Sequence, residues 1–233
     1  MLRRGAVEQS RSRQIYTYTF AVEAVPSRCR LLVDLEMTLP ELNAGRYCNR
    51  LVVQLNGTEL KNLEPGAYLD RYIRETDAAD ALRLGANELV IGIAASLREH
   101  GHRLWPPMLA GDFTVVRGET GDRIAAPVRE LALGDWTKLG FPDFAGEGRY
   151  RTTIRVPANE AAWLDLGELA DACEVWVDGQ CLGRRVAPPW RFAIPAASPE
   201  ERELEVRVIN TPNNLFEMQC RPVGLAGPVR LLC

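Results

Sequence analysis

The chain has 233 residues, of which 46% are hydrophobic and 25% are charged, and its net charge is −3 at pH 7. This length is enough for one large β domain or two smaller ones, each with a core of its own. The small acidic charge argues against nucleic acid or an anionic membrane as a partner, and no apolar run approaches the ~20 residues of a membrane-spanning helix.

Residues 1–14 contain basic side chains but no apolar stretch behind them. A secretory signal needs such a stretch, so none is predicted here, and a cytoplasmic location is the default expectation. We expect these residues to form a disordered arm or a linker.

Short segments that alternate apolar and polar residues follow one another along the chain, which is typical of strands that bury one face. In the first half they are YTYTFAV (16–22), LLVDLEM (31–37), LVVQLNGTEL (51–60), ANELVIGI (86–93) and LAGDFTVV (109–116). In the second half they are YRTTIRV (150–156), AWLDLGEL (162–169), EVWVDGQCLG (174–183), ERELEVRV (201–208) and LAGPVRLL (225–232). The shared order indicates a duplication. Helical periodicity is weak and limited to 74–85, where we expect one short helical turn.

Two dipeptides, Asn56-Gly57 and Asp178-Gly179, predict tight hairpins, because type I′ turns need a positive φ at both central residues. Short strands with such turns predict an all-β fold, namely two tandem antiparallel β-sandwiches. We expect the first over residues 15–117 and the second over 148–233. A linker is expected at 118–147, which is rich in Gly, Pro and charge.

Neither the six cysteines nor the two histidines form a distinctive metal motif. The cysteines lack C-x-x-C spacing, so we expect buried or free thiols, with a Cys173–Cys181 bridge as the alternative. His100 and His102 form an H-x-H pair that could chelate a metal on an extended strand, but without an evident third ligand a solvated loop is favoured. No cofactor is expected, although a sandwich of this kind can hold a structural calcium ion.

No catalytic motif stands out. Hydrolysis of a glycoside needs two carboxylates that flank a pocket. The candidates are Asp135, Asp143, Glu147, Asp165 and Glu217. None of them lies in a distinctive motif, so roles on strand surfaces or in turns are favoured, and whether the chain is an enzyme stays open. The nucleophile elbow, the P-loop and the dinucleotide fingerprint are absent from the sequence.

The tryptophans give the strongest binding signal, because sugar rings stack their C–H faces on aromatic rings while polar side chains bind the hydroxyls. Trp105 and Trp190 stand in proline-bearing loops, whereas Trp163 and Trp176 could face a core or its edge. The candidate carbohydrate-binding residues are Trp190, Arg184, Asn213, Asn214, Trp105 and Trp136. The alternative, which we favour for Trp190, is that it seals the end of the sandwich while Arg184 pairs with a surface acid.

Four stretches of the second half follow a known pattern. They are GDWTKLGFPDFAGEGRYRTTIRVP (134–157), WLDLGELADACEVWVDGQCLGRRVAPPWRF (163–192), ERELEVRVINTPNN (201–214) and RPVGLAGPVRLL (221–232). With them the chain resembles the C-terminal galactose-binding-like sandwich of bacterial α-L-rhamnosidases and the sugar-binding domains of family 2, β-galactosidase-like enzymes. The first half resembles, more loosely, the preceding sandwich of the same enzymes. Two departures are Asp178, where the family has Asn before the glycine, and 199–206, which lacks the usual G-x-N-x-L.

The resemblance implies a jelly-roll, galactose-binding-domain-like fold and a link to carbohydrates. The catalytic residues of these enzymes lie on a separate (β/α)-barrel of about 250 residues, for which this chain has no room. We therefore predict a non-catalytic accessory region of a glycoside hydrolase, which binds glycan weakly or supports a catalytic domain absent from this chain. One alternative is part of an active glycosidase completed by another domain or chain. The other is a structural protein-interaction domain.

Overall fold

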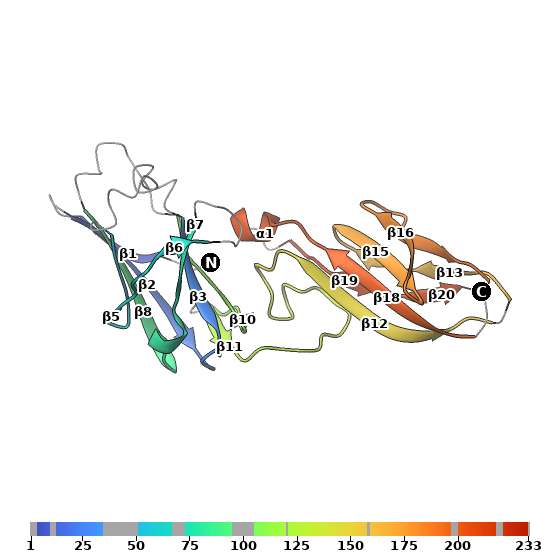
Figure 1. Cartoon of the computed structure of the whole chain (residues 1–233), viewed down its shortest axis with the longest axis horizontal. Coiled ribbons are helices and arrows are strands. Elements are labelled where there is room, and N and C mark those ends of the chain that lie inside the picture. The colour runs from blue at the N-terminus through green and yellow to red at the C-terminus, as the bar shows by residue number, and fades with distance from the viewer. Residues whose placement is uncertain are drawn as a thin grey trace. The chain divides into compact units, whose positions relative to one another are not determined.

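A computed structural model describes residues 4–9, 13–34, 51–66, 73–94, 105–119, 121–157, 159–196, 200–217 and 221–232. In these ranges the secondary structure is almost all strand, with one 3-10 turn and one short helix (Figure 1). The chain divides into two compact units, 1–129 and 130–233. The predicted all-β fold is confirmed. None of the described helices is long and apolar enough to span a bilayer.

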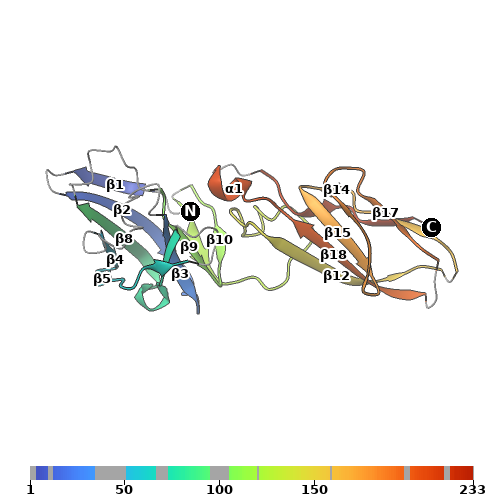
Figure 2. The same ribbon diagram turned by 45° about the horizontal axis from the view of Figure 1, so that its top comes forward.

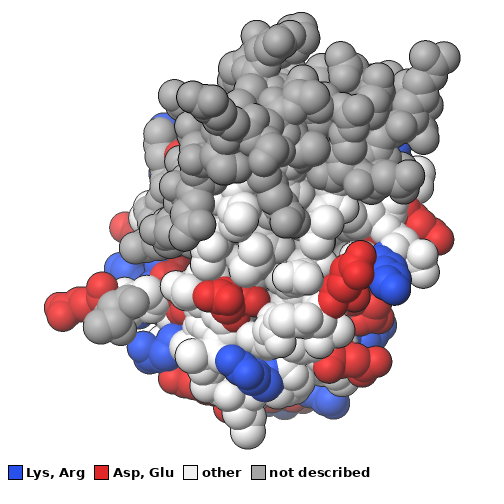
Figure 3. All heavy atoms as spheres, turned by 90° about the vertical axis from the view of Figure 1, so that its left-hand side faces the viewer, with Lys and Arg blue, Asp and Glu red and all other residues white. Residues whose placement is uncertain are grey.

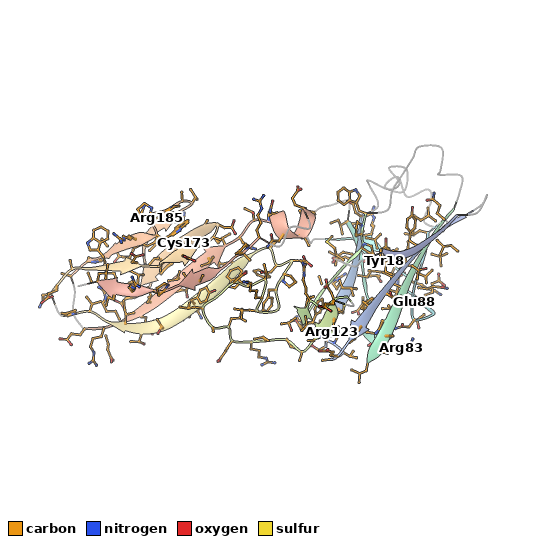
Figure 4. The ribbon with its side chains drawn as sticks, turned by 180° about the vertical axis from the view of Figure 1, so that it is seen from behind. Tyr18, Arg83, Glu88, Arg123, Cys173 and Arg185 are labelled. Carbon is orange, nitrogen blue, oxygen red and sulfur yellow. The ribbon has the colours of Figure 1, made fainter. Side chains whose placement is uncertain are left out.

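The first unit packs two sheets against each other. Its strands are β1 (Arg4–Gln9), β2 (Arg13–Val22), β3 (Cys29–Asp34), β4 (Leu51–Leu55), β5 (Thr58–Glu59), β6 (Glu64–Pro65), β7 (Ile73–Asp77), β8 (Gly85–Ala94), β9 (Met108–Gly111), β10 (Thr114–Val116) and β11 (Arg123–Ala125). One sheet has the order β10-β11-β2-β8-β4-β5, with β1 beside β2, and the other has the order β6-β7-β3-β9. Alternate residues of both sheets fill the core, among them Tyr18 of β2 (Figure 4), Leu31 and Ile91.

The second unit is also a sandwich. Its elements are β12 (Glu147–Arg155), β13 (Ala162–Asp165), β14 (Glu168–Leu169), β15 (Ala172–Val177), β16 (Gln180–Arg185), β17 (Arg191–Ile194), β18 (Glu201–Ile209), α1 (Asn213–Phe216), β19 (Leu225–Gly227) and β20 (Arg230–Leu232). One layer is the sheet β12-β18-β15-β16, whose strands β12, β18 and β15 lie side by side in Figure 2. The other layer contains β17-β13-β20 and the short pair β14-β19. The core between the layers includes Leu164, Val175, Phe192 and Val206.

The two units share one topology. The order β2-β8-β4-β5 of the first corresponds to β12-β18-β15-β16 of the second, and β7-β3-β9 corresponds to β17-β13-β20. The corresponding strands also follow one another in the same order along the chain. The order of segments that repeats in the sequence therefore corresponds to a repeated seven-strand pattern, and the duplication itself stays a prediction.

Two predicted connecting segments contain ordered structure. Strand β1 and the first residues of β2 lie within residues 1–14, so the prediction of a disordered arm is wrong there. The predicted linker at 118–147 contains β11, which pairs in parallel with β2. The two compact units divide inside this range, between Arg129 and Glu130. These segments are short or lack alternation, which is why their sequence gives no strand signal.

Trp136, also inside the predicted linker, is anchored in the core of the second unit. Its backbone N–H donates to Val223 O at 2.9 Å, and its indole Nε1 donates to Tyr150 Oη at 2.6 Å. Two glycines lie against the ring: a Cβ at Gly148 would lie 2.4 Å from a ring carbon, and one at Gly224 would lie 2.6 Å from Nε1. Only residues without a side chain allow the ring to lie this close to the backbone.

Three described cysteines, Cys29, Cys173 and Cys181, are free thiols. Cys173 is buried, with Arg185 opposite it on β16 (Figure 4), whereas Cys181 is exposed and opposite Trp176. The alternative of a Cys173–Cys181 bridge is therefore wrong. Burial raises the pKa of Cys29 to about 12 and that of Cys173 to about 11, so both thiols stay protonated at neutral pH.

The predicted turns are confirmed. Asn56 and Gly57 have φ values of 54° and 82°, and Asp178 and Gly179 have φ values of 50° and 76°. A 3-10 turn at Ala79–Ala81 is the helical turn that the sequence predicts within 74–85.

In the first unit two asparagines connect the turn to the start of β8. Asn56 Oδ1 accepts a hydrogen bond from Glu88 N at 3.0 Å, and Asn56 Nδ2 donates to Asn87 Oδ1 at 2.7 Å. Asn87 Nδ2 in turn donates to the carbonyl oxygens of Arg83 and Gly85. Figure 4 labels Arg83 and Glu88, which bound this stretch. Both polar atoms of the buried Asn87 amide therefore have hydrogen-bond partners, as is usual for buried polar groups.

The second unit has an ion pair at the corresponding positions. Asp178 Oδ1 accepts a hydrogen bond from Glu203 N at 2.9 Å, as in the first unit. Arg202 stands where Asn87 stands, and it donates from Nε to Asp178 Oδ2 at 2.7 Å and from Nη1 to Pro195 O at 2.9 Å. The ion pair of Asp178 and Arg202 thus stands where the first unit has the amide pair of Asn56 and Asn87.

Asp178→Asn is expected to lower the free energy of unfolding by about 1–2 kcal/mol, because it leaves the Arg202 side chain, 8% exposed, without its counter-ion. Urea unfolding followed by tryptophan fluorescence measures this, since the second unit holds four of the five tryptophans. Glu201→Gln, which removes the exposed pair with Arg155, is the control and should cost less than about 0.5 kcal/mol.

Adding Arg202→Asn to Asp178→Asn rebuilds the amide pair and should restore part of the loss; a double variant less stable than the single one would contradict this. The pKa of Asp178 lies below 3.8 because Arg202 donates to it. Such a carboxylate stabilises the fold fully above its unfolded-state pKa of ~3.9 and loses this effect as the pH falls further. The difference between the parent chain and Asp178→Asn should therefore shrink below about pH 4.

Candidate functional site

Two of the predicted site tryptophans are core residues. Trp136 is 3% exposed and Trp190 is 9% exposed, and both pack in the core of the second unit. Neither ring is therefore available as a stacking platform, which corrects that prediction. Trp190 has the packing role that we favoured for it.

The other predicted residues are dispersed. Arg184 on β16 pairs with a surface acid, Glu174, at 2.5 Å. Asn214 is buried, and its amide donates to Arg221 O at 2.8 Å and accepts from Arg221 N at 3.0 Å, so it closes the loop after α1. Asn213 is the half-buried first residue of α1. Trp105 is 39% exposed but belongs to the first unit.

Charges on the surface are mostly interspersed and paired. On the face shown in Figure 3, the described acidic and basic side chains alternate. The outer face of β12-β18-β15-β16 carries a continuous network of ion pairs, and the guanidinium of Arg207 lies 4.5 Å from the centroid of the Trp176 ring. In order of pairing, the network consists of Arg151, Glu205, Arg207, Glu174 and Arg184. Charges that satisfy one another in this way form a solvated surface.

The opposite outer face, on β17-β13-β20, is different. Trp163 of β13, the central strand, is 53% exposed. The register places Ala193 of β17 and Leu232 of β20 on either side of it, and Leu232 is 43% exposed. The indole N–H of Trp163 donates to no residue in the described ranges. An exposed apolar row therefore crosses this sheet.

A charged row lies beside the apolar row on the same face. Asp165 is two residues from Trp163, about 6.6 Å along the strand, and it stands opposite both Arg191 and Arg230. Arg191 Nε lies 2.7 Å from Asp165 Oδ2, and Gly167 N donates to Asp165 Oδ1 at 3.0 Å. These hydrogen bonds, first that from Gly167 and then that from Arg191, lower the pKa of Asp165. We call this surface the Trp163 face; its members are Trp163, Ala193, Leu232, Asp165, Arg191 and Arg230.

The Trp163 face combines an aromatic ring with hydrogen-bonding groups one strand repeat away. That combination suits a ligand with an apolar ring face and polar substituents. Trp163 is predicted from the sequence to face a core or its edge. The signal that could have found it is the alternation of AWLDL, in which Leu164 and Leu166 point inward and Trp163 and Asp165 share the other side.

Two of the candidate carboxylates, Asp135 and Glu147, make local structural contacts. Asp135 Oδ1 accepts hydrogen bonds from Thr137 N and Val223 N, at 3.0 and 3.2 Å. Glu147 pairs with Arg149. Among the described residues, no group of three or more His, Cys, Asp or Glu is placed to hold a metal, and the structural calcium ion stays a prediction. His100 and His102 lie outside the described residues.

The sequence matches no family model and no curated protein. Among solved structures, the alpha-L-rhamnosidase of Streptomyces avermitilis complexed with L-rhamnose is 13% identical, over 87% of this chain and 22% of its own, with a TM-score of 0.33. The rhamnosidase of Novosphingobium sp. PP1Y is 20% identical, over 97% of this chain and 22% of its own, with a TM-score of 0.34. The apo lectin of Pleurotus ostreatus is 12% identical, over 89% of this chain and 69% of its own, with a TM-score of 0.27.

The chain thus spans about a fifth of the length of the two rhamnosidases. TM-scores below 0.5 do not establish a shared fold, so no function is carried over from these structures.

Trp163→Ala is expected to lower the free energy of unfolding by about 1 kcal/mol or less, because the ring stands on an outer face. Trp190→Ala, a tryptophan of the same unit, should cost about 3–5 kcal/mol, because it empties part of the core. Urea unfolding followed by far-UV circular dichroism measures both changes. Equal losses in the two variants would show that Trp163 is also a core residue.

Proposed function

We propose that the chain is a non-catalytic, carbohydrate-associated module that binds glycan weakly through the Trp163 face. The observation that carries this proposal is the half-exposed indole at the centre of an outer sheet face. Contiguous exposed apolar surface rimmed by polar residues is typical of binding sites, and the row of Ala193, Trp163 and Leu232 has such a rim in Asp165 and its arginines. The C–H face of a sugar ring matches the indole, and its hydroxyls match the carboxylate and guanidinium groups of the charged row.

The charged row is suited to binding rather than to hydrolysis. A general acid for glycoside cleavage needs a raised pKa, because it must hold a proton at neutral pH. The pKa of Asp165 is instead lowered by its hydrogen bonds, so this carboxylate stays ionised and accepts hydrogen bonds. Asp165 therefore orients Arg191 and accepts hydrogen bonds from the hydroxyl groups of a ligand.

The affinity expected of this face is modest. One stacking ring and a few hydrogen bonds on an open surface must offset the cost of ordering the ligand, so dissociation constants in the millimolar range are expected. Such a module holds glycan near a catalytic domain or supports that domain, and its partners are therefore a carbohydrate or a glycosidase catalytic domain. The jelly-roll, galactose-binding-domain-like character of the two sandwiches is part of the same proposal.

The test is a titration of the isotope-labelled whole chain with rhamnose, galactose, fucose and glucuronate and their oligomers, followed by the indole N–H signals in a 15N–1H spectrum. The signal of Trp163, assigned with Trp163→Ala, should shift saturably with at least one sugar. The signals of the buried Trp136 and Trp190 should stay in place.

Trp105→Ala is the matched control, because it removes another partly exposed tryptophan and should leave the binding unchanged. If no sugar shifts the Trp163 signal, the proposal is wrong. A Trp163 signal that instead responds to protein concentration would assign the face to protein docking.

A further inference from the structure

The charges of the Trp163 face do not balance. Asp165 stands between two arginines in the strand register, Arg191 on β17 and Arg230 on β20. Arg191 takes one carboxylate oxygen at 2.7 Å and Gly167 N takes the other at 3.0 Å. Arg230 is exposed, and its guanidinium makes no hydrogen bond or ion pair with a residue in the described part of the chain. One carboxylate and two guanidiniums leave this row with an uncompensated positive charge.

Arg230 differs in this respect from the arginines of the opposite sheet. On the ion-paired outer face, Arg151, Arg184 and Arg207 each lie 2.5 Å from a carboxylate oxygen. Each of those guanidiniums already forms an ion pair with a carboxylate of the same sheet. Arg230, whose guanidinium has no hydrogen-bonded or ion-pair partner among the described residues, lies on the same face as the half-exposed Trp163.

The two groups are close enough to contact one ligand. Trp163 is opposite Leu232, two residues from Arg230, so Trp163 and Arg230 are diagonal neighbours about 7–8 Å apart, with their Cβ atoms somewhat closer. An arginine side chain spans much of this distance. A sugar ring stacked on the indole would place a substituent at its edge within reach of the guanidinium.

We propose that the Trp163 face selects saccharides that carry a carboxylate, namely uronic acid residues, and that Arg230 binds this carboxylate. The inference rests on the proposed function and adds the class of ligand. The planar fork of a guanidinium matches a carboxylate with two parallel hydrogen bonds, which is stronger and more directional than a bond to a hydroxyl. Arg230 is near enough to Asp165 to help lower the pKa of that carboxyl, but it makes no hydrogen bond to it, since the two oxygens accept from Arg191 and Gly167.

The experiment compares two ligands that differ only at carbon 6, methyl β-D-glucuronide and methyl β-D-glucoside, titrated into the whole chain and followed by the Trp163 indole signal. The glucuronide should bind about tenfold more tightly, because it adds a charge-assisted hydrogen bond. Its advantage should decrease as ionic strength rises, because the arginine is exposed.

Arg230→Gln should remove the advantage of the glucuronide, so that the variant binds the two sugars with equal affinity. Arg184→Gln, which removes an exposed arginine of the opposite face, is the matched control and should change neither affinity. Trp163→Ala, which lacks the reporting indole and is followed instead by the backbone amide signals of β13, should bind neither sugar. Acetate at the same concentration, a carboxylate without a ring, should leave the Trp163 signal unmoved.

The possible failures are distinguishable. Equal affinities for the two sugars, or a preference that survives Arg230→Gln, overturn the assignment to uronic acids and leave the proposed glycan binding intact. If neither sugar moves the Trp163 signal, both the inference and the proposed function fail. A shift caused by acetate alone would show simple anion binding and would also overturn the selection for saccharides.

Discussion

The burial of alternate residues along β13 determines which side chains of the second unit reach solvent. Ala162 and Leu164 are each 1% exposed because they fill the space between the two layers. Trp163 and Asp165 must then point to the other side, since successive side chains of a strand alternate. A slip by one residue would bury the charge of Asp165 without a partner, which is strongly unfavourable. The outward position of Trp163 and Asp165 thus follows from the burial of Ala162 and Leu164 in the core.

The two units share one topology, so a comparison of corresponding positions shows which contacts both have and which differ. In both units the backbone N–H at the start of the central strand needs an acceptor from the turn residue, and Asn56 and Asp178 both supply one. The second side chain matches the turn residue in each unit. Asn87 accepts a hydrogen bond from the amide of Asn56, and Arg202 donates one to the carboxylate of Asp178. Both units therefore keep the acceptor, while the pair of side chains around it differs, an amide pair in the first unit and an ion pair in the second.

Local sequence patterns were sufficient to predict most strands and both tight turns, because alternation and the Asn-Gly and Asp-Gly dipeptides act over a few residues. Strands β1 and β11 were missed because their stability comes from pairing with β2, which no local pattern reports. The exposed position of Trp163 could have been predicted from the sequence, because Leu164 and Leu166 alternate with it and are buried. The row of Asp165 with Arg191 and Arg230 was not, because it depends on the register of strands from distant parts of the chain.

The enclosure of Trp136 by Gly148 and Gly224 bears on how this sandwich can be moved between proteins. The ring comes from a segment that precedes the first strand of the second unit, yet it fills part of that unit's core. A shortened chain that begins at residue 148 would lose the ring and leave a void lined by two glycines that have no side chains to close it. The portable unit therefore begins at Glu130, and gene fusions or recombination events that preserve the sandwich must carry residues 130–147 along with it.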